Sequence, residues 1–371
     1  MDQRYPGFWD SLEKPVIGLA PMDGVTNLAC RRIVALHGRP DVLFTEFTSA
    51  EGLFYAPDRL LRDFEYEEAQ RPIVAQIYGH RPEDFYRAAH IVCELGFDGI
   101  DINMGCPSKS VTQRNCGAKL ITVPDLALEI IRSTRQGVHD WASGQTLEGL
   151  KIKEKVLKVV RAMNDQRCRG VLPYAPTGNR QIIPVSVKTR IGFDSVVIEW
   201  WIEILLQEQP VVVSIHGRTL KQMYRGEADW GAIARAVQVA KGSGTLIFGN
   251  GDVRSLEEAG RRITETGVDG VLLGRSTIGN PWVFRDKDRL KASLKQGTPC
   301  DFPNPFVAPA ERFRVALEHM DYFLKLRGDY HFQSIKKHLS GYLSHFPEAS
   351  VIRSQAMRAR TPMEVTSLLK V

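Results

Sequence analysis

The chain lacks any apolar run that could cross a membrane. Its longest apolar runs, such as VIEWWIEILL, are interrupted by charge, here at Glu199 and Glu203, whereas a membrane-spanning helix needs about 20 predominantly apolar residues. The start, MDQRYPGFWD, has neither the basic region nor the apolar stretch of a secretory signal. We therefore expect a cytoplasmic protein that does not bind a membrane.

Cysteine is scarce, and no two cysteines are closely paired. The six cysteines include no C-x-x-C pair, which argues against a disulfide scaffold and against a zinc ribbon. No metal site is predicted. We expect most of the cysteines to be small buried hydrophobic residues.

No charge of one sign dominates the chain. Lys and Arg number 49 and Asp and Glu 43, giving a net charge of +6, which permits a polyanionic partner without establishing one. Hydrophobic residues make up 43% and charged residues 25%, as in ordinary globular proteins. A length of 371 residues is typical of about two domains.

Short apolar runs alternate with stretches of helical periodicity over most of the chain. Because the runs are apolar almost throughout and each precedes a helical stretch, they predict a buried parallel sheet. Eight such units favour a closed (β/α)₈ TIM barrel within residues 1–300 over a doubly wound sheet. The strand candidates are residues 16–22, 42–47, 72–79, 99–105, 183–190, 211–218, 246–252 and 270–275.

The alternation breaks once, at about residues 137–181, which we interpret as an insertion because the stretch is longer than a barrel connection usually requires. It contains an amphipathic helix candidate, LKIKEKVLKVVRAM, and a loop, VLPYAPTGNRQ. Its basic residues outnumber its acids, which fits either a solvated helix face or a nucleic-acid contact. The basic residues are Lys151, Lys153, Lys155, Lys158, Arg161, Arg167, Arg169 and Arg180.

The end of the chain has a different character. The segment KQGTPCDFPNPFVAPA has the Pro and Gly content of a linker. Residues 307–371 then show apolar residues at helical spacing in three stretches, which predicts a small all-helical domain. Its basic residues include Lys336 and Lys337.

Chemically useful residues stand at the end of nearly every predicted strand. In a (β/α)₈ barrel the catalytic groups lie at the carboxyl ends of the strands, so we expect these side chains to meet at one end. They are Pro21 and Met22, Glu46, Gln76, Asn103 and Cys106, Lys188, His216, Asn250, and Gly274 with Arg275.

The last two strand ends indicate a phosphate-bearing cofactor. GNGD and GRSTIGNPW supply glycines for close backbone approach and Arg275 for a charge-assisted fork. A flavin mononucleotide (FMN) also fits the other ends. Pro21 and Met22 can form a floor for its ring, and Lys188 can favour its reduced anion. The amides of Gln76 and Asn103 can pair with its pyrimidine edge, and His216 can contact either its ring or its phosphate.

The motifs APMDGVTN, AQIYG, NMGCPSKSV, VKTRIGFD, HGRTLKQMYRGEADW, NGDV and GVLLGRSTIGNPW occur in order over about residues 16–285. They strongly resemble those of the tRNA-dihydrouridine synthases, particularly the bacterial type. The resemblance implies an FMN-dependent reduction of the C5–C6 bond of uridine in tRNA, with NADPH reducing the flavin, and an RNA-binding helical tail. It also implies that Cys106 is the catalytic cysteine, and that the FMN contacts are Gln76, Asn103, Lys188, His216, Asn250, Gly251, Gly274 and Arg275.

Cys106 then has a definable role. After hydride reaches C6 of the uracil, C5 needs a proton, and an ordinary thiol with a pKa of about 8.5 is protonated at neutral pH. Cys106 is the expected proton donor, whereas Cys116 is assigned no chemistry. The residues expected to contact RNA are Arg218, Lys109, Arg114, Tyr224, Lys336 and Lys337, with simple solvation an alternative for Lys109 and Arg114.

Two other functions remain to be weighed. One is a dihydroorotate dehydrogenase-like flavoprotein, against which the basic helical tail and the GCPSKSV loop argue. The other is a noncatalytic RNA-binding barrel, against which the joint presence of Cys106, Lys188 and His216 argues. The sequence leaves open which uridine is reduced, whether ribosomal RNA is a substrate, and NADPH versus NADH. We expect a monomer.

Overall fold

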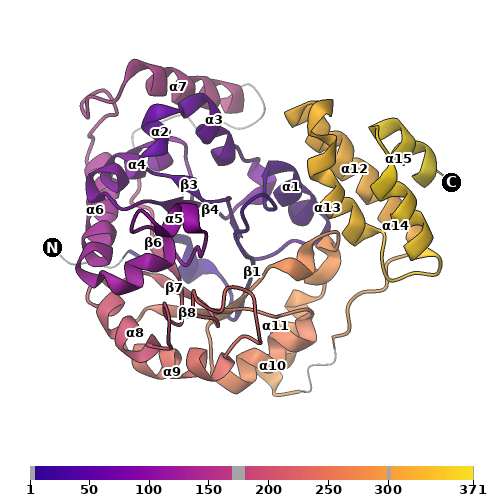
Figure 1. The fold of residues 1–371 in the computed structure, drawn as a ribbon. Coiled ribbons are helices and arrows are strands. Elements are labelled where there is room, and N and C mark those ends of the chain that lie inside the picture. The colour runs from indigo at the N-terminus through magenta and orange to yellow at the C-terminus, as the bar shows by residue number, and fades with distance from the viewer. Residues whose placement is uncertain (1–4, 169–179, 299–301, 371) are drawn as a thin grey trace.

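The computed structural model describes residues 5–168, 180–298 and 302–370 (Figure 1). Within these residues nine parallel strands form one sheet in the order β1-β9-β8-β7-β6-β5-β4-β2, and β3 also pairs with β4. The strands are β1 (Val16–Leu19), β2 (Leu43–Phe44), β3 (Thr48–Ser49), β4 (Ile73–Tyr78), β5 (Gly99–Met104), β6 (Val185–Arg190), β7 (Val212–His216), β8 (Leu246–Asn250) and β9 (Gly270–Leu273).

The two edges of this sheet meet, so the sheet closes into a barrel. The Leu19 amide donates to the Val42 carbonyl at 3.0 Å, and the Asp41 amide donates to the Ile17 carbonyl at 2.9 Å. Because β2 and β3 occupy one position beside β4, the barrel has eight strand positions. The predicted TIM barrel is therefore confirmed.

Where one strand was expected at residues 42–47, the structure has two short strands, β2 and β3, and β3 lies beyond residue 47. Between them the Thr45 hydroxyl, rather than a backbone carbonyl, accepts the Gln76 amide at 3.0 Å. The same hydroxyl donates to the Glu46 carbonyl at 2.8 Å. This side chain replaces part of the ladder, as Thr does when it competes for backbone groups, and the strand is interrupted there.

Helices surround the strands, and Figure 1 shows them as a ring. Trp9, on the 3₁₀ helix η1 (Gly7–Ser11), closes the amino end of the barrel, with its ring centroid 5.5 Å from that of Phe248. The surrounding helices are α1 (Leu28–His37), α2 (Gly52–Tyr55), α3 (Pro57–Leu60), α4 (Pro82–Glu94), α6 (Pro124–Ala142), α7 (Glu154–Cys168), α8 (Ile198–Leu206), α9 (Trp230–Ala240), α10 (Leu256–Thr266) and α11 (Lys287–Gln296). The short helix α5 (Lys109–Thr112) lies instead on the loop after β5.

Short 3₁₀ turns fill several connections between these elements. They are η2 (Leu61–Phe64), η3 (Glu68–Gln70), η4 (Gly117–Thr122), η5 (Arg275–Thr277), η6 (Pro281–Phe284) and η7 (Asp329–His331). The helix expected in the insertion is α7, while α6 continues to Ala142, past the expected start of the insertion at residue 137. Residues 169–179, which include Arg169 and most of the expected loop, lie outside the described residues, as does Cys300.

The carboxyl-terminal part is helical, as expected, and stands at one side of the barrel (Figure 1). Its apolar side chains form one cluster with Ala29 and Ile33 of α1 and with Trp282 of η6. His37 of α1 also pairs with Glu318 at 3.1 Å. The helices are α12 (Pro309–Arg327), α13 (Phe332–Tyr342), α14 (Ala349–Arg358) and α15 (Pro362–Leu369).

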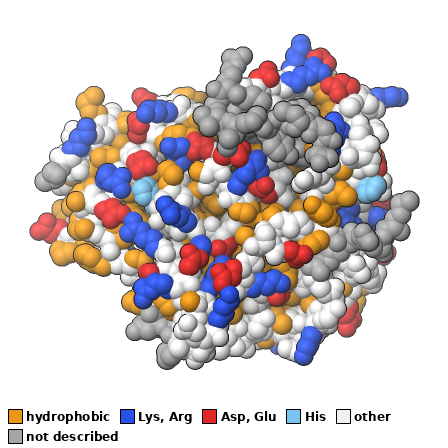
Figure 2. Space-filling model, turned by 180° about the vertical axis from the view of Figure 1, so that it is seen from behind, with side chains coloured by type: hydrophobic (Ala, Val, Ile, Leu, Met, Phe, Trp, Pro, Cys, Tyr) orange, Lys and Arg blue, Asp and Glu red, His pale blue; other side chains and the backbone are white. Residues whose placement is uncertain are grey.

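The surface carries both signs of charge. Figure 2, the view from behind, shows Lys and Arg side chains intermixed with Asp and Glu. Among the described helices, none has the length and apolar character needed to cross a membrane. In the same residues, no cluster of three His, Cys, Asp or Glu side chains is placed to hold a metal ion.

Candidate functional site

Strand register brings the predicted residues together at the carboxyl end of the barrel. Asn103 on β5 lies beside Lys188 on β6, and His216 on β7 lies beside Asn250 on β8. Gln76 on β4 lies beside Asp101 of β5, further from the carboxyl end of the barrel than Asn103. These positions form two connected groups of polar side chains.

The first group centres on the buried carboxyl of Asp101. Its two oxygens accept hydrogen bonds from Gln76 Nε2 and Ser186 Oγ, each at 2.6 Å. Burial raises the pKa of Asp101 to about 6 although both hydrogen bonds act to lower it. Because Gln76 Nε2 donates to Asp101, its Oε1 faces Asn103 and accepts from Asn103 Nδ2 at 2.9 Å. The amide orientations of both residues are thereby fixed.

Asn103 in turn holds the loop that carries Cys106. Its Oδ1 accepts the backbone amides of Gly105, at 3.0 Å, and Cys106, at 2.9 Å. On the other side of this turn, Arg190 Nε donates to the Gly105 carbonyl at 2.6 Å. The loop returns at Gly117, where φ is +58° and a Cβ would lie 2.7 Å from the Cys106 carbonyl oxygen. Only glycine fits this position without movement.

Cys106 is largely buried, but a small part of it is exposed. It is 8% exposed and packs with Val111 and Cys116, against Phe47 and Tyr78. Burial raises the pKa of its thiol, more than the nearby Arg190 and Lys188 lower it. The thiol therefore remains protonated at neutral pH, as a proton donor must. Cys116 lies on the same loop, and its Sγ is 3.6 Å from His80 Nδ1.

Lys188 places a cation at the centre of the strand ends. Its Nζ donates to Asn250 Oδ1 at 3.2 Å, and Asn250 Nδ2 donates to the Leu272 carbonyl at 2.8 Å. An ammonium has three N–H donors, so Lys188 can also donate to a bound molecule. Burial and the neighbouring Arg190 lower its pKa to about 8.

The second group links the ends of β7, β8 and β9. Asp252 accepts from Arg218 at 2.5 Å and from Arg275 at 2.9 Å. Arg218 also lies 3.3 Å from His216 Nε2. Burial, followed by the surrounding Arg and Lys side chains, lowers the pKa of His216 well below its usual value. His216 is therefore a neutral imidazole at physiological pH.

The glycines after β8 and β9 let the backbone approach its neighbours closely. Gly251 has φ +127°, and a Cβ there would lie 2.7 Å from the Ala228 Cβ and 3.1 Å from His216 Cδ2. At Gly274 a Cβ would project toward Met22 Sδ, 3.4 Å away. With Arg275 and the free donors of Lys188, this cradle fits a phosphate-bearing planar molecule. Pro21 and Met22 are partly exposed at its edge.

The residues expected to contact RNA are placed less uniformly. Lys109, Arg114 and Lys337 are exposed, and Tyr224 is 60% exposed. Arg218, in contrast, is 2% exposed and bound to Asp252, so it positions the site from within.

Lys336 has a helix-capping contact instead. Its Nζ donates to the carbonyls of Met357, at 2.9 Å, and Ala359, at 2.6 Å, at the end of α14. Hydrogen bonds from a basic side chain to the last carbonyls of a helix are typical of helix carboxyl ends. The ammonium of Lys336 is therefore occupied within the protein.

Sequence reasoning left out two residues that the structure places at the site. Arg190 donates to the carbonyls of Gly105 and Thr219 and so connects two loops, and Asp252 connects Arg218 with Arg275. Glu46, which was expected at a strand end, is 8% exposed, and burial, with Asp63 adding to it, raises its pKa to about 7. The position of each at or just after a strand end was the available signal.

A model of the dihydrouridine synthase (Dus) family matches residues 18–169 and 176–371. A probable tRNA-dihydrouridine synthase 2 of Bacillus subtilis (strain 168) is 30% identical over 368 residues, covering 98% of this chain and 95% of that protein. A probable tRNA-dihydrouridine synthase of Staphylococcus aureus (strain COL) is 30% identical over 374 residues, covering 98% and 94%.

Among solved structures, a DHODH from Eimeria tenella in complex with ferulenol matches with a TM-score of 0.41 and 16% identity, covering 67% of this chain and 64% of that one. The family model and both bacterial relatives extend over nearly the whole chain, from the first strands of the barrel through the carboxyl-terminal helices. This chain belongs to the dihydrouridine synthase family.

Proposed function

We propose that the protein reduces the C5–C6 double bond of uridine in tRNA, with FMN as its cofactor and NADPH as the reductant. The observation that carries this proposal is the convergence of a protonated thiol, Cys106, and a cation, Lys188, at adjacent strand ends. Asn103 links the two, since it pairs with Lys188 in the sheet and holds the amide of Cys106. The family membership of the chain supports the same reaction.

The site offers a separate partner for each part of FMN. Gly251, Gly274 and Arg275 would hold its phosphate, and Met22 with Pro21 would lie against its ring. Lys188 would donate to the ring, because two of its N–H groups are free of recorded protein acceptors in the described residues. Bound there, FMN supplies hydride to the substrate, and NADPH restores its reduced form.

Cys106 supplies the proton that completes the reduction. Its raised pKa keeps the proton on Sγ until the substrate arrives. The proton passes from Sγ to C5 of the uracil, and the resulting thiolate is stabilised by the nearby Lys188 and Arg190, both of which lower the pKa of this thiol. Solvent then returns a proton to Sγ. A positioned acid of this kind contributes about 10²- to 10⁴-fold to the rate.

The depth of Cys106 implies that the reacting base leaves its stack. With only 8% of this residue exposed, a uridine inside a folded RNA cannot reach the thiol without being turned into the pocket. Tyr224, which is 60% exposed, stands on the loop after β7 and is suited to stack on a neighbouring base. A tRNA substrate accords with a cytoplasmic location.

The direct test uses the purified full-length protein. We expect a yellow protein with flavin absorbance that, when given NADPH and an unmodified tRNA transcript, forms dihydrouridine detectable by mass spectrometry of the digested RNA. Free orotate and dihydroorotate serve as alternative substrates. A colourless protein that binds no added FMN, or turnover of the free pyrimidines without reduction of the RNA, would overturn the proposal.

A further inference from the structure

A basic surface lies on the rim of the barrel, apart from the residues around Cys106. We call it the basic rim. It is built on the end of α2, on α3 and η2, and on the start of α7 with the residues just before it, and all of its side chains are exposed. Its members are Tyr55, Arg59, Arg62, Lys151, Lys153, Lys155 and Lys158.

The basic rim lies at the open, carboxyl end of the barrel. β3 pairs with the last residues of β4, Thr48 with Ile77 and Ser49 with Tyr78. α2 begins at Gly52, directly after β3. The segment that contains Tyr55 and Arg59 therefore leaves the sheet at the end where Cys106 lies.

Two side-chain contacts attach the insertion to this segment. Lys155 Nζ lies 2.5 Å from Asp58 Oδ2. Lys153 Nζ lies 5.2 Å from the centre of the Tyr55 ring, a cation–π distance. Figure 1 shows α7 beside α2 and α3. The insertion thus adds its basic residues to a surface at the carboxyl end of the barrel.

The acids of this surface are neutralised within the protein, whereas several bases are not. Asp58 is paired with Lys155, and Glu148 and Glu154 are both paired with Arg161. Within residues 5–168, 180–298 and 302–370, no ion pair is recorded for Arg59, Arg62, Lys151 or Lys158. The basic rim therefore has an excess of positive charge at the protein surface.

The aromatic member narrows the class of partner. Tyr55 is 68% exposed, and an exposed aromatic ring among cations is the combination that binds nucleic acid, with phosphates on the cations and a base on the ring. Protein interfaces instead have an apolar core with few charges. Tyr55 is the one large hydrophobic side chain of the described rim that is exposed.

We propose that the basic rim binds the sugar–phosphate backbone of the substrate RNA at nucleotides outside the reacting uridine. This inference rests on the proposed function for the identity of the RNA. It assigns to the insertion a grip on the RNA that is separate from the chemistry at Cys106. Loss of the grip should weaken RNA binding and leave the chemical step intact once RNA saturates the protein.

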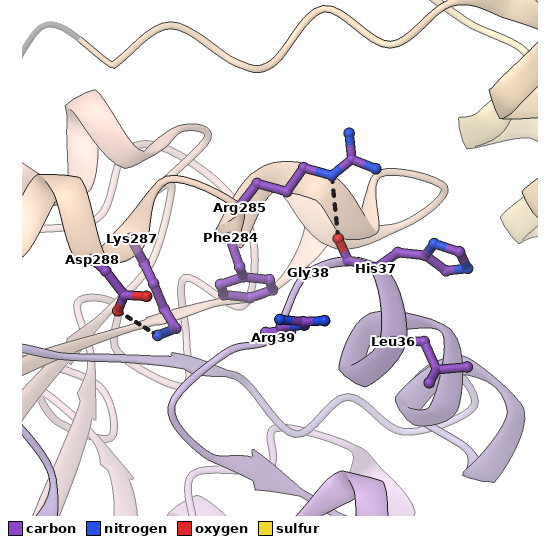
Figure 3. Close-up of a pocket in the computed structure, with 8 residues that line it drawn as sticks. All are labelled: Leu36, His37, Gly38, Arg39, Phe284, Arg285, Lys287 and Asp288. Atoms are coloured by element: carbon purple, nitrogen blue, oxygen red, sulfur yellow. Dashed lines mark hydrogen bonds and ion pairs between the residues drawn. The ribbon is translucent and has the colours of Figure 1, made fainter.

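The test compares two double variants of the full-length protein. Arg59→Ala with Lys158→Ala removes two charges from the basic rim. Arg39→Ala with Lys241→Ala removes two exposed charges from the opposite end, since Arg39 follows α1 just before β2 and Lys241 follows α9 before β8. Arg39 lines a hollow between α1 and α11 (Figure 3).

Affinity for an unmodified tRNA transcript is measured by fluorescence anisotropy at several salt concentrations. If the two rim residues each neutralise one phosphate, the dissociation constant at about 0.1 M salt should rise about 20- to 60-fold, and the slope of log K against log salt should fall by about 2. The maximal rate of dihydrouridine formation at saturating RNA should not change. Tyr55→Ala should weaken binding about fivefold or more.

Two results would overturn the rim as an RNA contact. One is unchanged affinity for tRNA in both the Arg59/Lys158 and the Tyr55 variants, while the protein without substitutions still binds and reduces tRNA. That result would leave the proposed function intact. The other is an equal loss in the Arg39/Lys241 variant, which would mean attraction by overall charge alone. If unmodified protein binds no RNA at all, the proposed function itself fails, and the rim proposal fails with it.

Discussion

The Asn103 side-chain carbonyl accepts the backbone N–H of Cys106, with 2.9 Å between Oδ1 and N. The same oxygen accepts the Gly105 amide, and the other end of the Asn103 amide donates to Gln76. The buried carboxyl of Asp101 fixes Gln76 in turn. The position of the thiol is thus set by a chain of hydrogen bonds that begins inside the barrel.

Replacing Asn103 should displace the thiol without removing it. Asn103→Ala leaves two loop amides and Gln76 Oε1 without their partner, and misplacement of a reacting group by about 1 Å can cost about 10² in rate. We expect a fall of that order in dihydrouridine formation at saturating RNA. Asn304→Ala, which removes an exposed amide with one contact at 3.5 Å, is the matched control and should retain the rate.

The return of the loop at Gly117 provides a second test of this positioning. Gly117→Ala and Gly297→Ala both place a side chain at positive φ, +58° and +65°, but only the first brings a Cβ within 2.7 Å of the Cys106 carbonyl oxygen. Each should lose about 1–2 kcal/mol of stability from the backbone conformation. Turnover should fall only in Gly117→Ala. Thermal melts measure the stability of both variants, and turnover is measured separately with tRNA. Equal turnover of the two variants would show that the loop does not position the thiol.

Flavin affinity should depend on pH through Lys188. Burial lowers the pKa of this ammonium to about 8. In the flavin-free protein, the Lys188 side chain therefore loses its charge as the pH rises through about 8. An anionic ligand favours the charged form, and the affinity for FMN should therefore fall above pH 8, by up to about tenfold per pH unit. Titration of protein stripped of flavin at pH 7, 8 and 9 measures this. Lys188→Met should bind more weakly with no such step; the same step in that variant would exclude Lys188 as its source.

Two buried histidines should make the carboxyl-terminal helices sensitive to acid. His319 and His338 are each 1% exposed, with ring centroids 4.7 Å apart. Burial lowers the pKa of both, that of His338 to about 3. Because the unfolded chain, with a His pKa of about 6.5, binds more protons, the free energy of unfolding is fully retained above pH 6.5 and decreases below it. The slope is up to about 1.4 kcal/mol per pH unit for each histidine.

Urea unfolding between pH 7 and pH 4 measures that slope. His338→Phe keeps a ring of similar size and removes one titrating group. The contribution of the two histidines to the slope should therefore fall by about half. An identical slope in the variant would mean that other groups cause the acid sensitivity.

The barrel was predictable because its strands are apolar almost throughout, and most of the residues expected at strand ends lie together at one end of the barrel. The division of the second strand was not predicted, because Thr45 favours strands by its branching while its hydroxyl takes over a ladder hydrogen bond. Helix α15 had a signal that was overlooked. In TPME, Thr361 caps the Glu364 amide at 3.3 Å and Pro362 starts the helix.

Long-range partners were the main limit at the site. Arg218 was expected to meet RNA, yet Asp252, far along the chain, holds it inside the protein. Lys336 likewise donates to carbonyls at the end of α14. The sequence alone does not distinguish a basic side chain that faces solvent from one that donates to a buried acceptor, because the difference depends on the tertiary structure. The roles of these residues toward RNA stay predictions.

The most direct test of the account is the rate of uridine reduction by Cys106→Ala, measured in a single turnover with flavin reduced beforehand. Cys116→Ala, which removes the neighbouring thiol of the same loop, is the matched control. We expect Cys106→Ala to hold FMN, accept electrons from NADPH and bind tRNA, while dihydrouridine forms about 10²- to 10⁴-fold more slowly and Cys116→Ala keeps its rate. An unchanged rate in Cys106→Ala would contradict the assignment of this thiol as the proton donor.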